Sequence, residues 1–411
     1  MHRGFIKFFG LALTATLMTS CASEMTEEEV VAHATELHQS LLTIDTHDDI
    51  PANFATEEVD PGEREGRQVT LPKMREGGLD VAFFVVYVGQ GERTPEANAE
   101  AKADALMKFE GIHRLAEEMH PDQIELAYTP DDVERIAESG KLVSVICIEN
   151  GYVVGRDITL VEQYYGLGAR YMTLTHGGHN DIGDSSTPRE QLGDAEEEHG
   201  GLSDFGKEVV AEMNRVGMMV DVSHVSKNTM LDAARLSRAP VMASHSSTKA
   251  LADVARNLDD EQLLAMKENG GVAQMVGLGG FVKVMPEKEA AMMELSEEIG
   301  LTSREARRNM SDEQRAEYES RVAVLDERWP PANVSDYVDH IDHAVQVAGV
   351  DHVGLGADMY PRTPSPVGIR SVEDYPNITR GLKERGYSDE DVRKILGGNF
   401  LRVWKHVTDG G

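Results

Sequence analysis

The chain has 411 residues, 40% of them hydrophobic, which suits one large α/β domain with a sizeable core. Lysine and arginine total 40 against 72 aspartate and glutamate residues, so the formal net charge is −32. A surface this acidic repels phosphate backbones, which excludes nucleic acid as a partner.

Residues 1–21 have the pattern of a secretory signal peptide. Arg3 and Lys7 give a basic start, an apolar stretch spans residues 8–18, and small residues then lead to Cys21. The sequence Met18-Thr19-Ser20-Cys21 is similar to a bacterial lipoprotein cleavage box, so we expect Cys21 to carry lipid and to provide the link to a membrane. The alternative is ordinary cleavage after Ala22. We predict export from a bacterial cytoplasm, to the periplasm or to the outer membrane as an attached lipoprotein.

Eight short apolar runs follow, separated by amphipathic stretches. The runs lack strict alternation, as expected of parallel strands that are buried on both faces. They are Leu42–Thr46, Val81–Val88, Leu142–Ile148, Arg170–Thr175, Met218–Val222, Pro240–Ser244, Gly271–Val276 and His352–Ala357. Helical spacing occurs between them, for example in Ala97–Met119, Ser203–Val216 and Asp259–Asn269. We predict an α/β fold, a (β/α)₈ TIM barrel that forms a single domain over residues 41–411, with residues 22–40 leading into it. An open doubly wound sheet is the alternative.

One connection is unusually long. Between the seventh and eighth runs, the charged and Met-rich stretch Pro286–Arg328 precedes Pro330-Pro331 and the amphipathic segment Ser335–Ala348. The stretch predicts a helical hairpin inserted within residues 283–334. It is a lid, a dimer contact or a solvated excursion, and we expect the protein to be a homodimer. The tail Tyr387–Val407 predicts a final amphipathic helix, with Ser388 as its N-cap.

Polar side chains follow most of the predicted strands. Barrel enzymes keep their catalytic groups at the carboxyl ends of their strands. Four histidines and three carboxylates stand at these ends. They are His47, Asp49, Glu149, His176, His224, His245 and Asp358. Each alone is weak evidence, but the set at one end of different strands predicts a functional site.

The set has the chemistry of a divalent metal site. Imidazole and carboxylate are the usual ligands of hydrolytic zinc. Five residues can hold two Zn²⁺ ions per chain, with Glu149 between the metals. These are His47, Asp49, Glu149, His224 and His245. A hydroxide bridging the two metals would then be a nucleophile at neutral pH. Asp358 is left free, placed to move a proton.

Several motifs resemble those of the membrane (renal) dipeptidase family, peptidase family M19, of the amidohydrolase superfamily. The resemblance runs in order from about Leu42 to Trp404. Its motifs are Thr46-His47-Asp48-Asp49-Ile50-Pro51, Leu174-Thr175-His176, Asp221-Val222-Ser223-His224-Val225-Ser226, Ser244-His245-Ser246-Ser247 and Gly397-Gly398-Asn399-Phe400. The resemblance implies a barrel of the metal-dependent hydrolase type with two zinc ions, which hydrolyses dipeptides and often tolerates a D-residue on the C-terminal side.

The resemblance also implies residue roles. His47 and Asp49 would hold one zinc ion, His224 and His245 the other, and Glu149 would bridge them. His176 would polarise the scissile carbonyl and bind substrate there, and Arg256 would pair with the free carboxylate of the dipeptide.

Three segments depart from the family pattern and leave substrate preference open. Asn150-Gly151-Tyr152 stands in place of Gly-Gly-His after the bridging glutamate. Val276-Gly277-Leu278 stands in place of Asn-Phe-Tyr, whose tyrosine helps to hold the substrate carboxylate, and Met359-Tyr360-Pro361 replaces Phe-Asp-Gly. The alternative function is another metal-dependent hydrolase of the same barrel type, acting on an ester, lactone or cyclic amide. A non-catalytic binding lipoprotein is a further alternative, against which Asp358 argues.

Overall fold

The computed structural model describes residues 26–303, 306, 309–359 and 365–410. The predicted signal peptide and Cys21 lie outside these residues, so their assignment stays a prediction. Within the described part of the chain, none of the helices has both the length and the apolar character that crossing a bilayer requires.

Eight parallel strands form the wall of a nearly closed barrel. Their order is β1-β2-β4-β5-β6-β7-β8-β9. Their bounds are β1 Ile44–Asp49, β2 Val81–Tyr87, β4 Leu142–Glu149, β5 Ala169–Thr173, β6 Met219–Asp221, β7 Met242–Ala243, β8 Val272–Met275 and β9 Val353–Leu355. A parallel bridge between Asp48 and Met359 brings the first strand to the segment after the last. The predicted (β/α)₈ barrel is confirmed, and each of the eight apolar runs contributes one strand.

The structure contains one short strand, β3, that the sequence analysis did not predict. β3, Ile124–Leu126, pairs with β4 outside the ring. The predicted strand Pro240–Ser244 is also shorter, because β7 ends at Ala243. The backbone N–H of Ser244 donates to Asp221 Oδ1 at 2.8 Å, so the ladder gives way to a side-chain contact at this end of the barrel.

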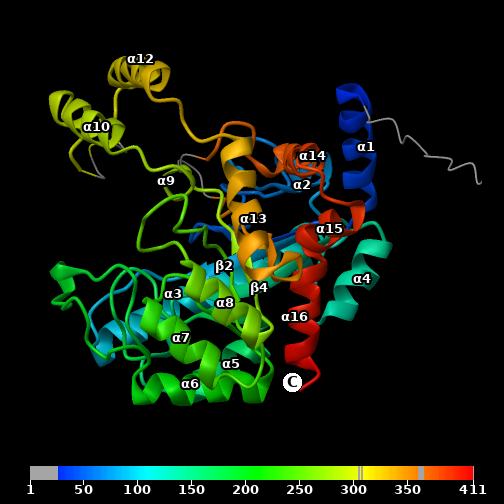
Figure 1. Ribbon diagram of the computed structural model, residues 1–411. Coiled ribbons are helices and arrows are strands. Elements are labelled where there is room, and N and C mark those ends of the chain that lie inside the picture. The colour runs from blue at the N-terminus through cyan, green and yellow to red at the C-terminus, as the bar shows by residue number, and fades with distance from the viewer. Residues whose placement is uncertain (1–25, 304–305, 307–308, 360–364, 411) are drawn as a thin grey trace, which may run out of the picture.

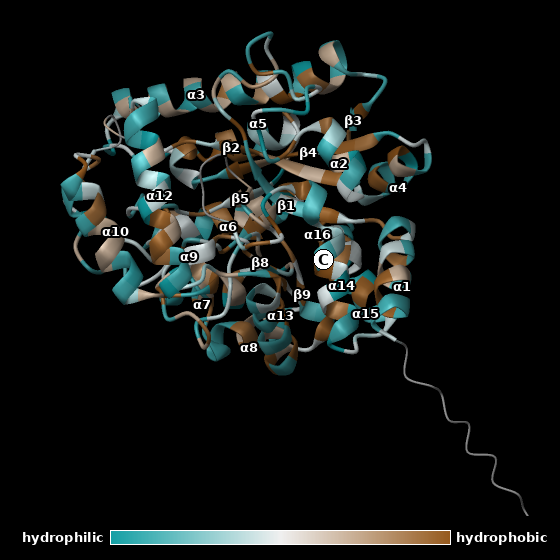
Figure 2. Ribbon diagram, turned by 90° about the horizontal axis from the view of Figure 1, so that it is seen from above, coloured by the Kyte–Doolittle hydropathy of each residue, from teal (hydrophilic) through white to brown (hydrophobic). Residues whose placement is uncertain are grey.

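Helices surround the strands (Figure 1). Their bounds are α1 Glu27–Ser40, α2 Leu71–Gly77, α3 Pro95–Arg114, α4 Pro130–Glu138, α5 Thr159–Gly166, α6 Asp204–Val216, α7 Lys227–Leu236, α8 Asp260–Asn269, α9 Gly279–Val282, α10 Pro286–Glu298, α12 Asp312–Arg328, α13 Val334–Ala348, α14 Pro376–Glu384, α15 Asp389–Arg393 and α16 Asn399–Thr408. The three helical stretches that the sequence predicts between strands are present as α3, α6 and α8. Figure 2 shows hydrophobic strands such as β2 and β4 inside a ring of helices of mixed hydropathy.

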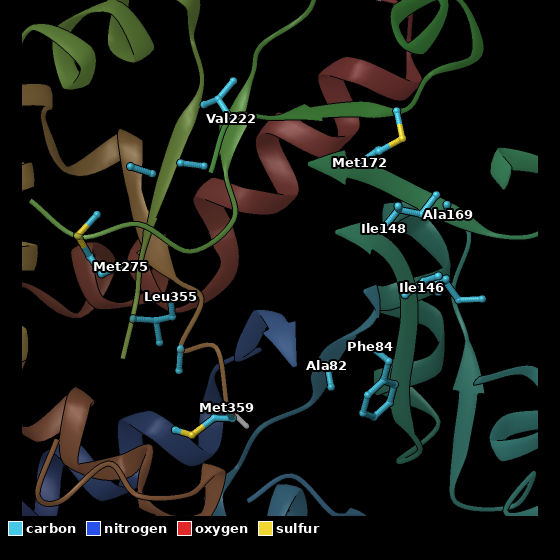
Figure 3. Packing of buried hydrophobic residues seen from close by; sticks show 14 of the residues in the cluster. Ala82, Phe84, Ile146, Ile148, Ala169, Met172, Val222, Met275, Leu355 and Met359 are labelled. Carbon is cyan, nitrogen blue, oxygen red and sulfur yellow. The ribbon is translucent and has the colours of Figure 1, made fainter. Parts of the chain in front are cut away.

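Alternation along the strands divides the core into two layers. On β2, Val81, Phe83 and Val85 belong to one buried cluster, which includes Trp404 of α16. Successive side chains of a strand point to opposite faces, so the residues between them face the surrounding helices. Figure 3 shows members of this outer cluster, among them Ala82, Phe84, Ile146, Ile148 and Met172.

α16 is part of the inner cluster. The ring centroid of Phe83 lies 4.9 Å from that of Phe400 and 5.7 Å from that of Trp404. The predicted single helix over Tyr387–Val407 is interrupted at Gly397. A β-carbon at Gly397 would lie 2.9 Å from the Leu42 carbonyl oxygen, so the close approach of the chain to the start of β1 breaks the helix. Ser388 is the N-cap, as predicted, because its hydroxyl oxygen accepts a hydrogen bond from the backbone N–H of Asp391 at 3.1 Å.

In the described part of the chain, the predicted insertion between the last two strands contains the helices α10 and α12, which stand away from the barrel in Figure 1. Lys288 pairs with Asp326 at 2.7 Å, and Arg321 pairs with Glu298 at 2.5 Å. α12 buries none of its residues. The predicted hairpin is therefore confirmed, and its role as lid or dimer contact stays a prediction.

Candidate metal and substrate site

The barrel brings the predicted site residues together. His47 and Asp49 lie in β1, Glu149 ends β4, and the others follow the carboxyl ends of their strands. Six predicted site residues line one cavity of about 780 Å³. They are Asp49, Glu149, His176, His224, Arg256 and Asp358. His47 and His245 are fully buried and contact Glu149 at the edge of this cavity.

Glu149 is the centre of the histidine cluster. Its Oε1 atom lies 2.9 Å from His224 Nε2 and 3.4 Å from His245 Nε2. The Nε2 atoms of His47 and His176 are each 3.6 Å from the same oxygen. Four ring nitrogens therefore converge on one carboxylate oxygen, which makes Glu149 the residue that all four histidines share.

The histidines form two groups that share Glu149. His47 and His245 form the first with ring centroids 3.7 Å apart, and His176 and His224 form the second at 4.1 Å. The expected pairing differs, because it places His245 with His224 and Asp49 with His47. The Nε2 atoms of His224 and His245 are nevertheless 2.8 Å apart, so the two rings are also neighbours. The assignment of ligands to each metal therefore stays a prediction.

Tyr171 orients His47. The Tyr171 hydroxyl donates to the Thr46 carbonyl oxygen at 2.7 Å, and it also lies 2.8 Å from His47 Nδ1. Because the hydroxyl proton is directed to Thr46, the hydrogen-bond network assigns the proton of a neutral His47 ring to Nδ1. The lone pair of Nε2 then points into the cluster, as a metal ligand requires.

His245 is oriented in the same way. The Ser244 hydroxyl donates to Asp221 Oδ2 at 2.6 Å and lies 2.7 Å from His245 Nδ1. Asp221 also accepts the backbone N–H groups of Ser223 and Ser244 through Oδ1. This buried network leaves Nε2 of His245 free to bind a cation. The sequence analysis assigned a role to neither Tyr171 nor Ser244, although Ser244 stands in one of the family motifs.

The charges of the cluster favour a cation. Burial alone would lower the pKa of His47, but the Glu149 carboxylate raises it to about 9. Burial alone would raise the pKa of Glu149, but the imidazoles of His176 and His47 hold it well below its usual range. Burial, helped by Glu149, raises the pKa of Asp49 to about 6. A metal ion bound here would take the place of the proton on His47.

The donor set fits a divalent metal. Nε2 of His47 and Oδ1 of Asp49 are buried and have no hydrogen-bond partner among the described residues. Leaving such atoms without partners in the folded state costs free energy. Imidazole nitrogens and carboxylate oxygens are the ligands that hydrolytic metals prefer. These residues could therefore hold a metal cofactor.

The backbone beside the cluster is strained. His224 has a φ angle of 66°, Asp358 of 57° and Asn150, which follows Glu149, of 80°. Non-glycine residues rarely adopt the left-handed region, and such strain gathers at functional sites. In this chain the left-handed conformation turns the backbone just after three strands whose ends contribute to the cavity.

Arg256 is buried and lines the cavity. Its terminal nitrogens donate to the His245 carbonyl oxygen at 3.0 Å and to Ser246 Oγ at 3.3 Å. Its Cζ atom lies 5.5 Å from the centre of the Phe281 ring, and Nε has no partner among the described residues. Burial lowers the pKa of Arg256 to about 10, so the guanidinium stays charged at neutral pH.

Sequence reasoning missed several residues of the cavity that can interact with a polar substrate. Tyr87, Lys108 and Arg189 line it, from β2, α3 and the loop after β5. Tyr87 is the last residue of β2, so its strand-end position was a signal that the sequence analysis passed over, whereas Lys108 and Arg189 lie away from the strands and offered none. A larger cavity of about 970 Å³ lies beside the insertion, but none of the predicted site residues lines it.

Known proteins resemble this chain over nearly its whole length. The model of the membrane dipeptidase family, peptidase family M19, matches residues 31–410. The dipeptidase tcpJ of Claviceps purpurea (strain 20.1) is 32% identical over 346 residues, which cover 83% of this chain and 69% of that protein.

Solved structures of dipeptidases and other peptidases also resemble this chain. The probable dipeptidase PvdM from Pseudomonas aeruginosa has a TM-score of 0.82 at 30% identity, covering 93% of this chain and 100% of that one. A metallo peptidase from Rhodobacter sphaeroides, solved with a phosphinate mimic of the dipeptide L-Ala-D-Ala, shares the fold. Its TM-score is 0.65 at 21% identity, with 89% and 99% of the two chains covered. The chain thus belongs to the membrane dipeptidase family, peptidase family M19, and is a metal-dependent dipeptidase.

Proposed function

We propose that the protein hydrolyses the peptide bond of dipeptides, including those with a D-residue on the C-terminal side, with two zinc ions. The proposed ligands are His47, Asp49, Glu149, His224 and His245. The observation that carries the proposal is the convergence of four imidazole nitrogens on Glu149 Oε1, beside a cavity that also contains Arg256 and Asp358. When bound, the metals would lower the pKa of a water and so supply a nucleophile at neutral pH.

Arg256 and His176 would position the substrate. The guanidinium of Arg256 would accept the C-terminal carboxylate of a dipeptide through charge-assisted hydrogen bonds. Burial lowers the pKa of His176, an effect that Arg256 and Arg189 reinforce, so its ring is neutral at neutral pH. A neutral imidazole has one N–H, which would donate to the scissile carbonyl oxygen and stabilise the negative charge that develops there.

Asp358 would move the proton. Burial raises its pKa well above the usual range, and the nearby carboxylates of Asp49 and Glu149 add to this effect, while His47 opposes it. A carboxyl group held beside the reacting atoms can accept a proton in one step and donate it in the next. Asp358 would accept the proton that the attacking water loses and would return it to the leaving amine nitrogen.

The test combines metal analysis with turnover. The purified protein is assayed with L,L- and L,D-dipeptides beside ester, lactone and cyclic amide panels, before and after chelation and after addition of zinc. We expect about two zinc ions per chain and zinc-dependent cleavage of dipeptides, with little turnover in the other panels. Turnover of esters or lactones alone would support the alternative hydrolase, and full activity without metal would contradict the proposed mechanism.

A further inference from the structure

Arg189 presents its guanidinium group to the same cavity, beside His176. The residue lies in the loop after β5 and lines the cavity together with Gly177. A β-carbon at Gly177 would lie 2.9 Å from Nη2 and 3.3 Å from Cζ of Arg189. Glycine at this position therefore leaves room for the guanidinium to lie flat against the backbone that follows His176.

This guanidinium has no partner in the described part of the chain. No hydrogen bond or ion pair joins it to another described residue. The nearby Asp194 uses Oδ2 to accept the backbone N–H groups of His179 and Arg189, at 2.9 and 2.8 Å. Two other arginines are paired instead: Arg93 binds Glu198 at 2.7 Å, and Arg156 binds Asp181 at 3.1 Å. Arg189 is thus left with its donors available on the wall of a cavity.

The other two cations of the cavity are already engaged. Lys108 donates to the Ile50 carbonyl oxygen at 2.9 Å, and its Nζ lies 5.5 Å from the centre of the Tyr87 ring. Arg256 is held by the His245 carbonyl oxygen and is the proposed partner of the C-terminal carboxylate. A dipeptide with neutral side chains has only this one carboxylate. The donors of Arg189 would then remain unmatched in the complex.

We propose that Arg189 binds a second anionic group of the substrate, so that the preferred substrates are dipeptides with an acidic side chain. The proposal rests on the dipeptidase function proposed above and adds a substrate class to it. Guanidinium and carboxylate form bidentate, charge-assisted hydrogen bonds, which explains why an uncommitted arginine selects for a carboxylate. The acidic residue can occupy the first or the second position, and the assay separates the two.

The assay compares charged with neutral side chains of equal shape. kcat and KM are measured for Ala-Glu against Ala-Gln and for Glu-Ala against Gln-Ala. We expect wild-type protein to prefer the glutamate dipeptide in one of these pairs. Arg189→Gln should lower this preference in kcat/KM by roughly 10- to 150-fold, mainly through KM, as expected for loss of a charged hydrogen bond.

Two further variants separate binding from a structural effect. Arg189→Glu should reverse the charge preference, so that the lysine dipeptide is favoured over the glutamine dipeptide in the same position. Arg156→Gln is the matched control, since the Arg156 side chain is 68% exposed, pairs with Asp181 and does not line the cavity. Its preference for glutamate should equal that of wild type.

The outcomes distinguish the two proposals. Dipeptide hydrolysis without a preference for glutamate at either position would overturn the role of Arg189 alone. The same conclusion follows if Arg189→Gln keeps the preference. If wild-type protein hydrolyses none of the dipeptides, the proposed function fails and the substrate class fails with it.

Discussion

The Nδ1 atom of His47, on β1, lies 2.8 Å from the phenolic oxygen of Tyr171, on β5. The two residues are 124 positions apart in the chain, and both are fully buried. The hydroxyl donates in turn to the Thr46 carbonyl oxygen, so the tyrosine holds both the ring and the strand that carries it. Such contacts behind a ligand fix which ring nitrogen faces a metal.

Tyr171→Phe should weaken metal binding by roughly 10- to 100-fold, because the His47 ring loses the acceptor that fixes its orientation. Competition with a chelator of known affinity measures this change. Tyr164→Phe is the control, since Tyr164 is also buried but donates to the Val153 carbonyl oxygen, away from the site. Equal metal affinity in both variants would show that Tyr171 has no part in the metal site.

Arg256→Ala should raise KM for dipeptides by roughly 10- to 150-fold, because a charged hydrogen bond of about 1.5–3 kcal/mol is lost. C-terminally amidated dipeptides, which lack the free carboxylate, should show little of this loss. Since Arg256 also donates to the His245 carbonyl oxygen, metal content must be measured on the same sample. Equal losses on acids and amides at normal metal content would remove Arg256 from substrate binding.

Asp358→Asn should lower kcat by about 10²–10⁴-fold while metal content and substrate binding stay near normal, because asparagine keeps the shape but carries no proton. Metal analysis and steady-state kinetics on one preparation test this expectation. A fall in metal occupancy would make Asp358 a ligand instead. If Asp358→Asn keeps full activity, Asp358 is only a polar residue at the rim of the cavity.

The partly buried carboxyl group of Asp80, away from the site, should make the stability of the fold depend on pH. Burial raises its pKa to about 6, although the N–H of Thr43 donates to Oδ2 at 2.9 Å. The folded state therefore holds more protons than the unfolded state between pH values of about 4 and 6, and stability falls as pH rises through this window. Asp80→Asn should flatten this fall and stabilise the protein at pH 7 by about 1–3 kcal/mol.

Denaturant midpoints from about pH 4 to 7 measure the effect of Asp80→Asn. Asp253→Asn is the control, because the Asp253 side chain is 85% exposed and a change there should leave the pH dependence as it is. An unchanged pH slope in the Asp80 variant would contradict the expectation.

Local sequence determined the strands and the chemistry at their ends. Apolar runs that lack alternation mark strands buried on two faces, and the polar residues that directly follow such a run lie at the carboxyl end of the barrel. This is why His176, His224 and Asp358 could be placed beside Glu149 from the sequence. The ends of β7 and of the last helix could not be predicted from the sequence. They are set by contacts that Ser244 and Gly397 make with distant segments of the chain.

Only the tertiary structure decided which residues surround these groups. Tyr171 reaches His47 across the barrel, and Arg189 reaches the cavity from a long loop. The sequence around either residue has no motif or periodicity that would reveal such a contact. Both contacts depend on how the closed ring of strands brings side chains from distant positions of the chain to one end, which is a property of the whole barrel and not of any local segment.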